Sequence, residues 1–254
     1  MEGRTPLISI RKLKKSYQTQ DGELQALGDV TFDVYPNEFV TIVGPSGCGK
    51  TTLLKILAGL VPKTEGEIFV DEEHFDPKRE MGFVFQKALL LNWRRVVDNV
   101  LLPIEILKLD RKSKKKKAEE LLELVGLKGF ENSYPKELSG GMQQRVSIAR
   151  ALIHDPKVLL MDEPFGALDA LTREKMNLEL LRIWKESKKT ILFVTHGINE
   201  AIFLSDRVII LSARPSNMIK ALDIPLRRPR TLEVRTSPAF GKLALEVYNL
   251  LELT

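Results

Sequence analysis

The chain has 254 residues, which is enough for one large domain or for a core with a smaller inserted lobe. Its composition, 43% hydrophobic and 29% charged, is that of a globular protein, and no apolar run approaches the roughly 18 residues of a membrane-spanning helix. The single cysteine, Cys48, excludes an internal disulfide and suits a reducing compartment. The net charge of +5 is modest, and part of it lies in residues 111–117, a run typical of the solvated start of a helix. Contact of this run with an anionic lipid surface or with nucleic acid is the alternative.

The N-terminal segment predicts a small antiparallel sheet. Residues 7–13 and 26–34 alternate between apolar and polar side chains, as half-exposed strands do, and a polar turn at residues 20–23 lies between them. Tyr17 precedes this turn. Its ring would either stack on a nucleotide base or pack on the sheet surface, and its position alone leaves both alternatives open.

A glycine-rich stretch between a strand and a helix predicts a phosphate-binding loop. Residues 38–43 are apolar and β-branched, residues 52–58 have helical spacing, and the sequence between them fits G-x-x-x-x-G-K-[ST]. Glycines let backbone N–H groups approach phosphate oxygens without Cβ clashes, and the start of the helix adds its positive dipole end. We expect Lys50 to reach the β- and γ-phosphates and the Thr51 hydroxyl to bind Mg²⁺. A turn that binds nothing is the alternative. The predicted phosphate-binding residues are Gly44, Pro45, Ser46, Gly47, Cys48, Gly49, Lys50, Thr51 and Thr52.

The rest of the chain alternates between strands and helices. Because the strands are apolar throughout, the pattern predicts a mainly parallel sheet covered on both faces. A helical segment from about residue 92 to 150 interrupts the alternation, and we interpret it as an inserted lobe. Strands are expected at residues 65–70, 81–86, 158–161, 190–195 and 207–211, and helices at residues 118–125, 142–153, 170–185 and near 200–204.

Two consecutive carboxylates follow the most apolar of these strands. Residues 158–161 predict a buried strand whose carboxyl end presents Asp162 and Glu163 at the sheet edge, where ligands bind in open α/β sheets. We expect Asp162 to hold Mg²⁺, directly or through water, and Glu163 to act as the base that polarises an attacking water. An ordinary acidic turn would have the same sequence pattern.

A second anion site is predicted at Ser139, Gly140 and Gly141. The serine can cap the helix that follows, and the glycines leave its N-terminal amides accessible. One chain with two phosphate-binding helix ends is best explained by a head-to-tail dimer, in which the partner's glycines and serine close over each nucleotide.

Together these motifs resemble the nucleotide-binding subunit of an ATP-binding cassette (ABC) transporter over nearly the whole chain. Gly44 to Thr51 correspond to Walker A, residues 138–143 to the signature, residues 158–163 to Walker B and residues 165–169 to the D-loop. The resemblance implies an α/β fold, a P-loop NTPase (RecA-like) core with a mainly parallel sheet, an N-terminal antiparallel β subdomain and an inserted α-helical subdomain. The chain is expected to be a single ABC ATPase domain, 1–254, with its core at 1–91 and 151–254 and its helical signature subdomain at 92–150.

The family also implies roles for single residues. Gln86 corresponds to the Q-loop glutamine, which helps to sense Mg²⁺ and couples to the membrane subunit, and His196 to the switch histidine at the γ-phosphate. Tyr17 lies where the family has its adenine-stacking aromatic. The resemblance thus implies catalytic roles for Glu163, His196, Gln86 and Lys50, metal binding by Thr51, Gln86 and Asp162, and ATP contacts by Tyr17, Ser139, Gly140, Gly141 and Asp169.

Within the family, residues 89–100 and 163–173 are similar to the nitrate/sulfonate/taurine importer group. Two positions depart from that group: Asn92 replaces a usual proline, and Gly197 replaces a frequent aspartate after the histidine. The resemblance implies an ATPase with ATP and Mg²⁺ as cofactors that works as a homodimer on the cytoplasmic face of the membrane. Its expected partners are integral membrane permease subunits and, indirectly, a solute-binding protein, with no nucleic acid.

Two other functions are alternatives to this interpretation. A soluble ABC ATPase that acts on nucleic acid or ribosomes would commonly carry two cassettes or a long coiled-coil insertion, and this sequence has neither. A non-hydrolysing regulatory module would have a degenerate Walker B or signature, and both motifs are intact here.

Overall fold

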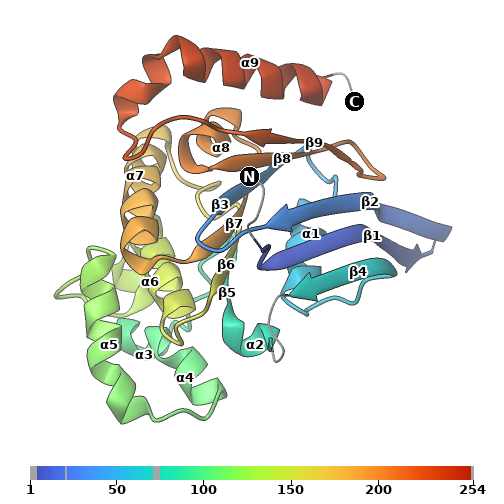
Figure 1. Cartoon of the computed structure of the whole chain (residues 1–254). Coiled ribbons are helices and arrows are strands. Elements are labelled where there is room, and N and C mark those ends of the chain that lie inside the picture. The colour runs from blue at the N-terminus through green and yellow to red at the C-terminus, as the bar shows by residue number, and fades with distance from the viewer. Residues whose placement is uncertain (1–4, 21, 71–74, 253–254) are drawn as a thin grey trace. The chain divides into compact units, whose positions relative to one another are not determined.

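The computed structural model describes residues 5–20, 22–70 and 75–252 (Figure 1). The chain forms two compact units. One, the discontinuous unit, comprises the residues up to 77 and from 190 onward, and the other, the central unit, comprises residues 78–189. The narrower helical subdomain at 92–150 stays a prediction.

The discontinuous unit contains the antiparallel sheet expected at the N-terminus. Its strand order is β2-β1-β4, with β1 at Ile8–Thr19, β2 at Gly22–Val34 and β4 at Glu65–Val70. Both β2 and β4 pair antiparallel with β1, so the prediction is confirmed, although β1 and β2 are longer than the alternating segments that predicted them.

The same unit contains three parallel strands that are buried at every position. These are β3 (Phe39–Val43), β7 (Thr190–Val194) and β8 (Arg207–Leu211), with β3 in the middle. The strand β9 (Met218–Asp223) pairs antiparallel with β8. Helix α8 packs against β3 and β8, and α9 packs on α8 and β8 (Figure 1). The helices of this unit are α1 (Lys50–Leu57), α8 (Ile198–Leu204) and α9 (Pro238–Glu252), with a 3-10 turn at Leu232–Thr236.

The central unit is mostly helical around one strand pair. Strands β5 (Met81–Val84) and β6 (Val158–Asp162) run parallel, and helix α6 packs against β5, α3 and α5. Short helix α2 (Pro77–Glu80) leads into β5. The other helices are α3 (Val96–Val100), α4 (Leu102–Ile106), α5 (Arg111–Leu124), α6 (Gly140–Leu152) and α7 (Ala170–Ser187), with a 3-10 turn at Pro135–Glu137.

The helical stretch predicted from residue 92 is divided into three helices for local reasons. Lys108 adopts a left-handed φ of 55° after α4, and the Asp110 side chain then caps α5 by accepting from the N–H groups of Lys112 and Ser113. Helix α5 stops just before Gly126, which has a φ of 69°. The basic run therefore begins a helix, as the sequence indicated, and most of its side chains are exposed.

Among the residues that the structure describes, we find no helix with both the length and the apolar character needed to span a bilayer.

A substitution at Gly82 in β5 can test how closely α6 packs against this strand. A methyl group added at Gly82 would lie 2.4 Å from the Ala151 carbonyl oxygen, so Gly82→Ala is expected to destabilise the protein by roughly 1–3 kcal/mol. Chemical denaturation measures the change. The matched control is Gly241→Ala in α9, where an added methyl meets no heavy atom within 4 Å and helix propensity makes the change neutral or slightly stabilising. Equal unfolding midpoints for the two variants would contradict the close packing at Gly82.

Candidate functional site

The glycine-rich loop lies between β3 and α1, where the sequence predicted a strand and a helix. Gly47 and Gly49 have φ values of 75° and 106°, which side chains rarely adopt. A methyl group at Gly49 would also lie 2.8 Å from Leu27 Cδ2 and 3.0 Å from the Ala26 carbonyl oxygen. The loop therefore keeps its curvature and its contact with β2 only with glycine at this position.

The Lys50 ammonium group is held inside the loop. Lys50 is 5% exposed, and its Nζ donates to the carbonyl oxygens of Gly44 (2.8 Å) and Pro45 (2.9 Å). The Cys48 thiol is also buried, and this burial raises its pKa although Lys50 and Arg214 exert an opposing effect. A buried neutral thiol is a poor nucleophile, so Cys48 acts here as a small residue that fits the loop.

His196 emerges at the same edge of the parallel strands as this loop. Ile42 of β3 pairs with Val194 of β7, so the two strands end side by side, and the Thr195 N–H donates to the Ile42 carbonyl (3.3 Å). His196 is exposed just beyond this point. The discontinuous unit thus presents His196 and the phosphate loop at one sheet edge.

The turn that carries His196 does not depend on the residue at Gly197. Thr195 Oγ1 accepts from the Gly197 N–H (3.0 Å) and donates to Glu200 Oε2 (2.5 Å), which fixes the turn before α8. The φ of Gly197 is −88°, and an added methyl would meet only ordinary contacts of 3.4 Å or more. The backbone conformation at this position is therefore open to glycine, as in this chain, and equally to a residue with a Cβ.

Tyr17 lies on β1 opposite Leu24, and its side chain is half-buried. The Lys15 ammonium group lies 4.7 Å from the centre of its ring, a cation–π contact on the sheet surface. This contact fits the packing role, and adenine stacking by Tyr17 stays a prediction.

In the central unit, Gln86 and Glu163 meet at the end of the parallel pair β5 and β6. Val84 pairs with Met161, and beyond that register the Gln86 Nε2 donates to Glu163 Oε2 at 3.5 Å. Glu163 has a left-handed φ of 43°, which costs on the order of 1 kcal/mol or more for a residue with a Cβ and is common at functional sites. The turn is closed by the Gly166 N–H, which donates to the Glu163 carbonyl (3.1 Å). Asp162 is 7% exposed, whereas Glu163 is more accessible.

The available ligands suit magnesium rather than a protein-only metal cage. Within the described parts of the chain, no group of three or more His, Cys, Asp or Glu residues could hold a metal ion. Mg²⁺ usually takes only one or two protein oxygens, together with water and substrate phosphates. Thr51 in the discontinuous unit and Gln86 and Asp162 in the central unit have side-chain oxygens of the kind that Mg²⁺ prefers, and their binding of the ion stays a prediction.

Ser139 caps α6 as predicted. Its Oγ accepts from the Met142 N–H (3.3 Å), and α6 begins at Gly140, two residues before the expected start. Ser139 and Gly140 are exposed, whereas Gly141 is buried. The N-terminus of α6 thus presents the Ser139 side chain to solvent, as an anion site requires.

Residues 27–166, more than half of the chain, match the ABC transporter family. The chain belongs to the ABC transporter family. It is 48% identical over 246 residues to the aliphatic sulfonates import ATP-binding protein SsuB of Bacillus thuringiensis subsp. konkukian, covering 96% of each chain. It is 42% identical over 250 residues to the taurine import ATP-binding protein TauB of Roseobacter denitrificans, covering 96% of this chain and 93% of the relative.

Solved ABC cassettes have the same fold. The dimeric structure of MJ0796, a bacterial ABC transporter cassette, matches with a TM-score of 0.74 and 35% identity over 87% of this chain and 100% of that one. The MJ0796 cassette in a post-hydrolysis state with ADP and Pi also matches with a TM-score of 0.74. The predicted family, fold class and ATPase activity are thereby confirmed.

Helix α6 also supports the segment on both sides of Gln86, through contacts that the sequence did not predict. Gln144 Nε2 donates to the Phe85 carbonyl (3.0 Å), and the Arg150 guanidinium donates to the carbonyls of Ala88 (2.7 Å) and Leu89 (2.8 Å). Burial lowers the pKa of Arg150. These hydrogen bonds join side chains to loop carbonyls about 60 residues away, so no local sequence pattern predicts them.

The D-loop has a structural function that the sequence also did not predict. Asp169 caps α7 by accepting from the Thr172 N–H (3.0 Å). Arg173 donates to the carbonyls of Leu168 (2.9 Å), Phe165 (3.3 Å) and Gly166 (3.4 Å). Whether Asp169 also contacts ATP stays a prediction.

The capping and charge of Asp169 can be separated by two variants. Asp169→Ala removes the cap and is expected to lower the thermal midpoint, whereas Asp169→Asn keeps the cap without its charge and is expected to lower the midpoint less. The hydrogen bonds from Thr172 lower the pKa of Asp169, so the stability from its charge is complete above the usual aspartate pKa and is lost as the pH falls through the folded value. The wild-type advantage over Asp169→Asn should therefore shrink in acid, as thermal scans at several pH values would show. Equal midpoints for the alanine and wild-type proteins would contradict the capping role.

Proposed function

We propose that this chain is the ATPase subunit of an importer for a small solute of the nitrate, sulfonate or taurine type, acting at the cytoplasmic face of the membrane. One observation carries the proposal: the match to sulfonate and taurine import ATP-binding proteins extends over 96% of the chain. Glu163 follows directly after β6 in this chain.

The phosphate loop and the carboxylates divide the chemistry between them. Lys50 and the backbone N–H groups of the loop bind the phosphates. Thr51, Asp162 and Gln86 would hold Mg²⁺, which would neutralise negative charge on the phosphates. Glu163 accepts a proton from a water whose oxygen attacks the γ-phosphorus. The bond from that phosphorus to the bridging oxygen breaks, and ADP leaves with the electron pair.

A head-to-tail homodimer completes each nucleotide site. The exposure of Ser139 and Gly140 at the N-terminus of α6 supports the binding of an anion there. The partner's Ser139 and the partner's Gly141 would neutralise charge that develops on the γ-phosphate. The dimeric MJ0796 cassette supports this assembly. Tyr17 would stack on adenine, His196 would contact the γ-phosphate, and Asp169 would approach the nucleotide.

The surface that follows Gln86 is the proposed docking site for the permease subunits. The side chains of Leu89 and Trp93, four residues apart in this segment, are 58% and 76% exposed and are available to an apolar surface of a partner. Arg94 forms a bidentate ion pair with Glu105 (2.8 and 2.6 Å) that holds this segment in place.

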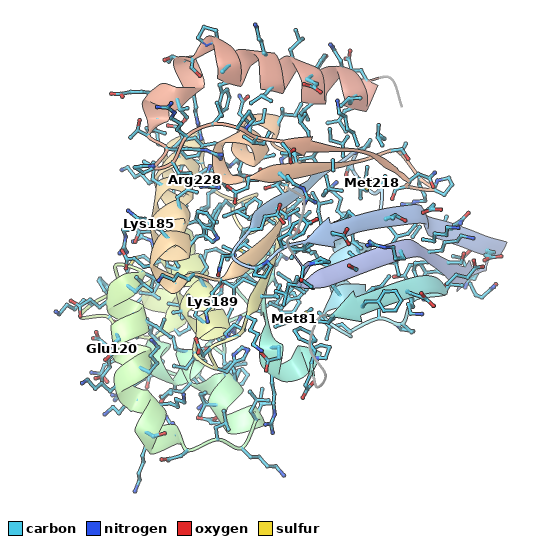
Figure 2. The ribbon with its side chains drawn as sticks, viewed as in Figure 1. Met81, Glu120, Lys185, Lys189, Met218 and Arg228 are labelled. Carbon is cyan, nitrogen blue, oxygen red and sulfur yellow. The ribbon has the colours of Figure 1, made fainter. Side chains whose placement is uncertain are left out.

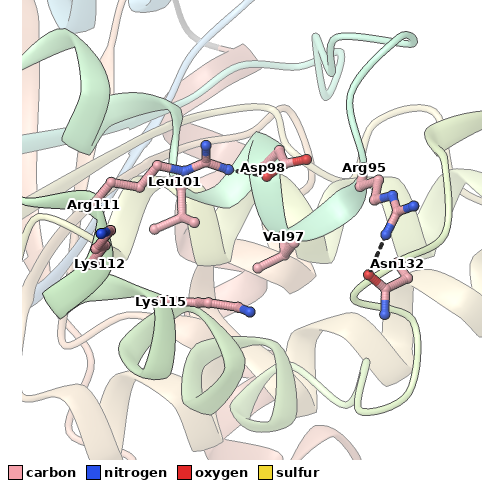
Figure 3. A pocket seen from close by; sticks show the side chains of 8 residues that line it. All are labelled: Arg95, Val97, Asp98, Leu101, Arg111, Lys112, Lys115 and Asn132. Carbon is pink, nitrogen blue, oxygen red and sulfur yellow. Dashed lines mark hydrogen bonds and ion pairs between the residues drawn. The ribbon is translucent and has the colours of Figure 1, made fainter.

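A cavity of about 580 Å³ in the same unit extends the docking surface (Figure 3). Its wall carries four basic side chains and one carboxylate, and Lys115 reaches across it below Val97. An apolar and acidic cytoplasmic segment of a permease complements this lining, and a solute-binding protein would act through the permease. The lining residues are Arg95, Val97, Asp98, Leu101, Arg111, Lys112, Lys115 and Asn132.

The hydrolysis step is tested by Glu163→Gln. Loss of the base is expected to lower the rate of phosphate release at least about 100-fold while ATP binding persists, which stabilises the ATP-bound dimer. Phosphate release and size-exclusion chromatography with ATP measure the two effects. The control is Glu120→Gln, a change at an exposed carboxylate on α5 (Figure 2). Wild-type turnover in Glu163→Gln would remove this residue from the role of base.

The docking surface is tested by Trp93→Ala. An exposed aromatic anchor commonly contributes about 2 kcal/mol or more to an interface, so this variant is expected to lose at least tenfold in affinity for the detergent-solubilised permease subunits. Phe69→Ala is the control, because Phe69 is also apolar and 54% exposed but lies on β4. Both variants should keep the wild-type thermal midpoint. If Trp93→Ala binds the permease as tightly as Phe69→Ala, the segment after Gln86 is not the interface.

A further inference from the structure

Side chains of the segment between β8 and β9, residues 212–217, donate hydrogen bonds to carbonyl groups of the phosphate loop. Arg214 donates from Nη2 (2.7 Å) and Nε (3.2 Å) to the carbonyl oxygen of Gly47. The Ser216 hydroxyl, which is fully buried, donates to the carbonyl oxygen of Cys48. Two consecutive peptides of the loop are therefore fixed by two side chains of one distant segment.

This segment is itself fixed on β2. The Gly28 N–H donates to the Ser216 carbonyl (2.8 Å), and the Asp29 N–H donates to Asn217 Oδ1 (2.7 Å). Gly28 is needed for this approach, because a methyl group there would lie 2.5 Å from Asn217 Oδ1. Hydrogen bonds to β2 therefore fix the position of the β8–β9 connection without a bound nucleotide.

Holding these carbonyls determines where the neighbouring amide points. In a planar trans peptide the C=O and the next N–H point in opposite directions, so a Cys48 carbonyl bound to Ser216 turns the Gly49 N–H to the other side. Without such bonds, the glycines at 47 and 49 would give the loop many alternative conformations. The guanidinium also adds a positive charge next to Gly47 that favours a triphosphate.

We propose that Arg214 and Ser216 are positioning residues that hold the phosphate loop in the shape that binds nucleotide phosphates. Their effect is on nucleotide affinity and not on the hydrolysis step. The inference rests on ATP binding at this loop.

The experiment measures ATP affinity and turnover separately. Arg214→Ala is expected to raise the Kd for MgATP about tenfold, as for loss of a hydrogen bond from a charged donor, while kcat at saturating ATP stays within about twofold. Arg214→Lys keeps one donor and the charge and should recover much of the affinity, whereas Arg214→Gln keeps a donor without the charge and should recover less. Arg227→Ala, at an exposed arginine, is the control and should bind ATP as the wild type does.

A merely structural role is distinguished by thermal scans. Arg214→Ala should keep the nucleotide-free midpoint of the wild type and lose part of the upward shift caused by ATP. The proposal is overturned if the Kd is unchanged, if kcat falls as much as the affinity, or if the nucleotide-free midpoint falls and accounts for the weaker binding. Failure of the proposed import function is distinguishable from all of these, because it would leave the ATP affinities of the wild type and of the variants unchanged.

Discussion

The site depends on the close approach of a side-chain-poor loop to the backbone around it. A methyl group at Gly44 would lie 2.9 Å from the Leu211 carbonyl oxygen, and one at Gly49 would lie 3.0 Å from that of Ala26. The loop is therefore packed between the end of β8 and the start of β2, with Lys50 bonded into its interior. An anion that binds here meets amides and an ammonium group whose positions are already determined, so little ordering is needed at binding.

In the central unit, backbone conformation and hydrogen bonds position the side chain of Glu163. Glu163 leaves a buried strand in a left-handed conformation that is held by the Gly166 N–H and accompanied by the Gln86 side chain. Helix α6, which Ser139 caps, donates a hydrogen bond from Gln144 to the carbonyl of Phe85, the residue before Gln86. Glu163, which we propose as the base, Gln86 and helix α6 are thus joined by hydrogen bonds within the central unit.

The sequence predicted the parts of this protein that have strong local patterns. Buried strands such as β6 and the glycine-rich loop before α1 were found at nearly their observed positions, and the cap at Ser139 follows from its residue type. Strand β9 was not predicted, because only Leu222 of its six residues is buried. Helix α9 was not predicted either, although it buries Phe240 and Val247. The bond from Arg214 to Gly47 joins residues 167 positions apart, and no local pattern predicts such a contact.

The shared architecture of the two nucleotide sites is tested most directly by mixing two inactive variants. Lys50→Ala disables the phosphate loop, and Ser139→Arg blocks the signature. If each site combines the loop of one copy with the signature of the other, a mixed dimer has one site with both defects and one intact site. An equal mixture should then regain up to about a quarter of wild-type ATPase activity. A mixture that is no more active than the separate variants would contradict the account.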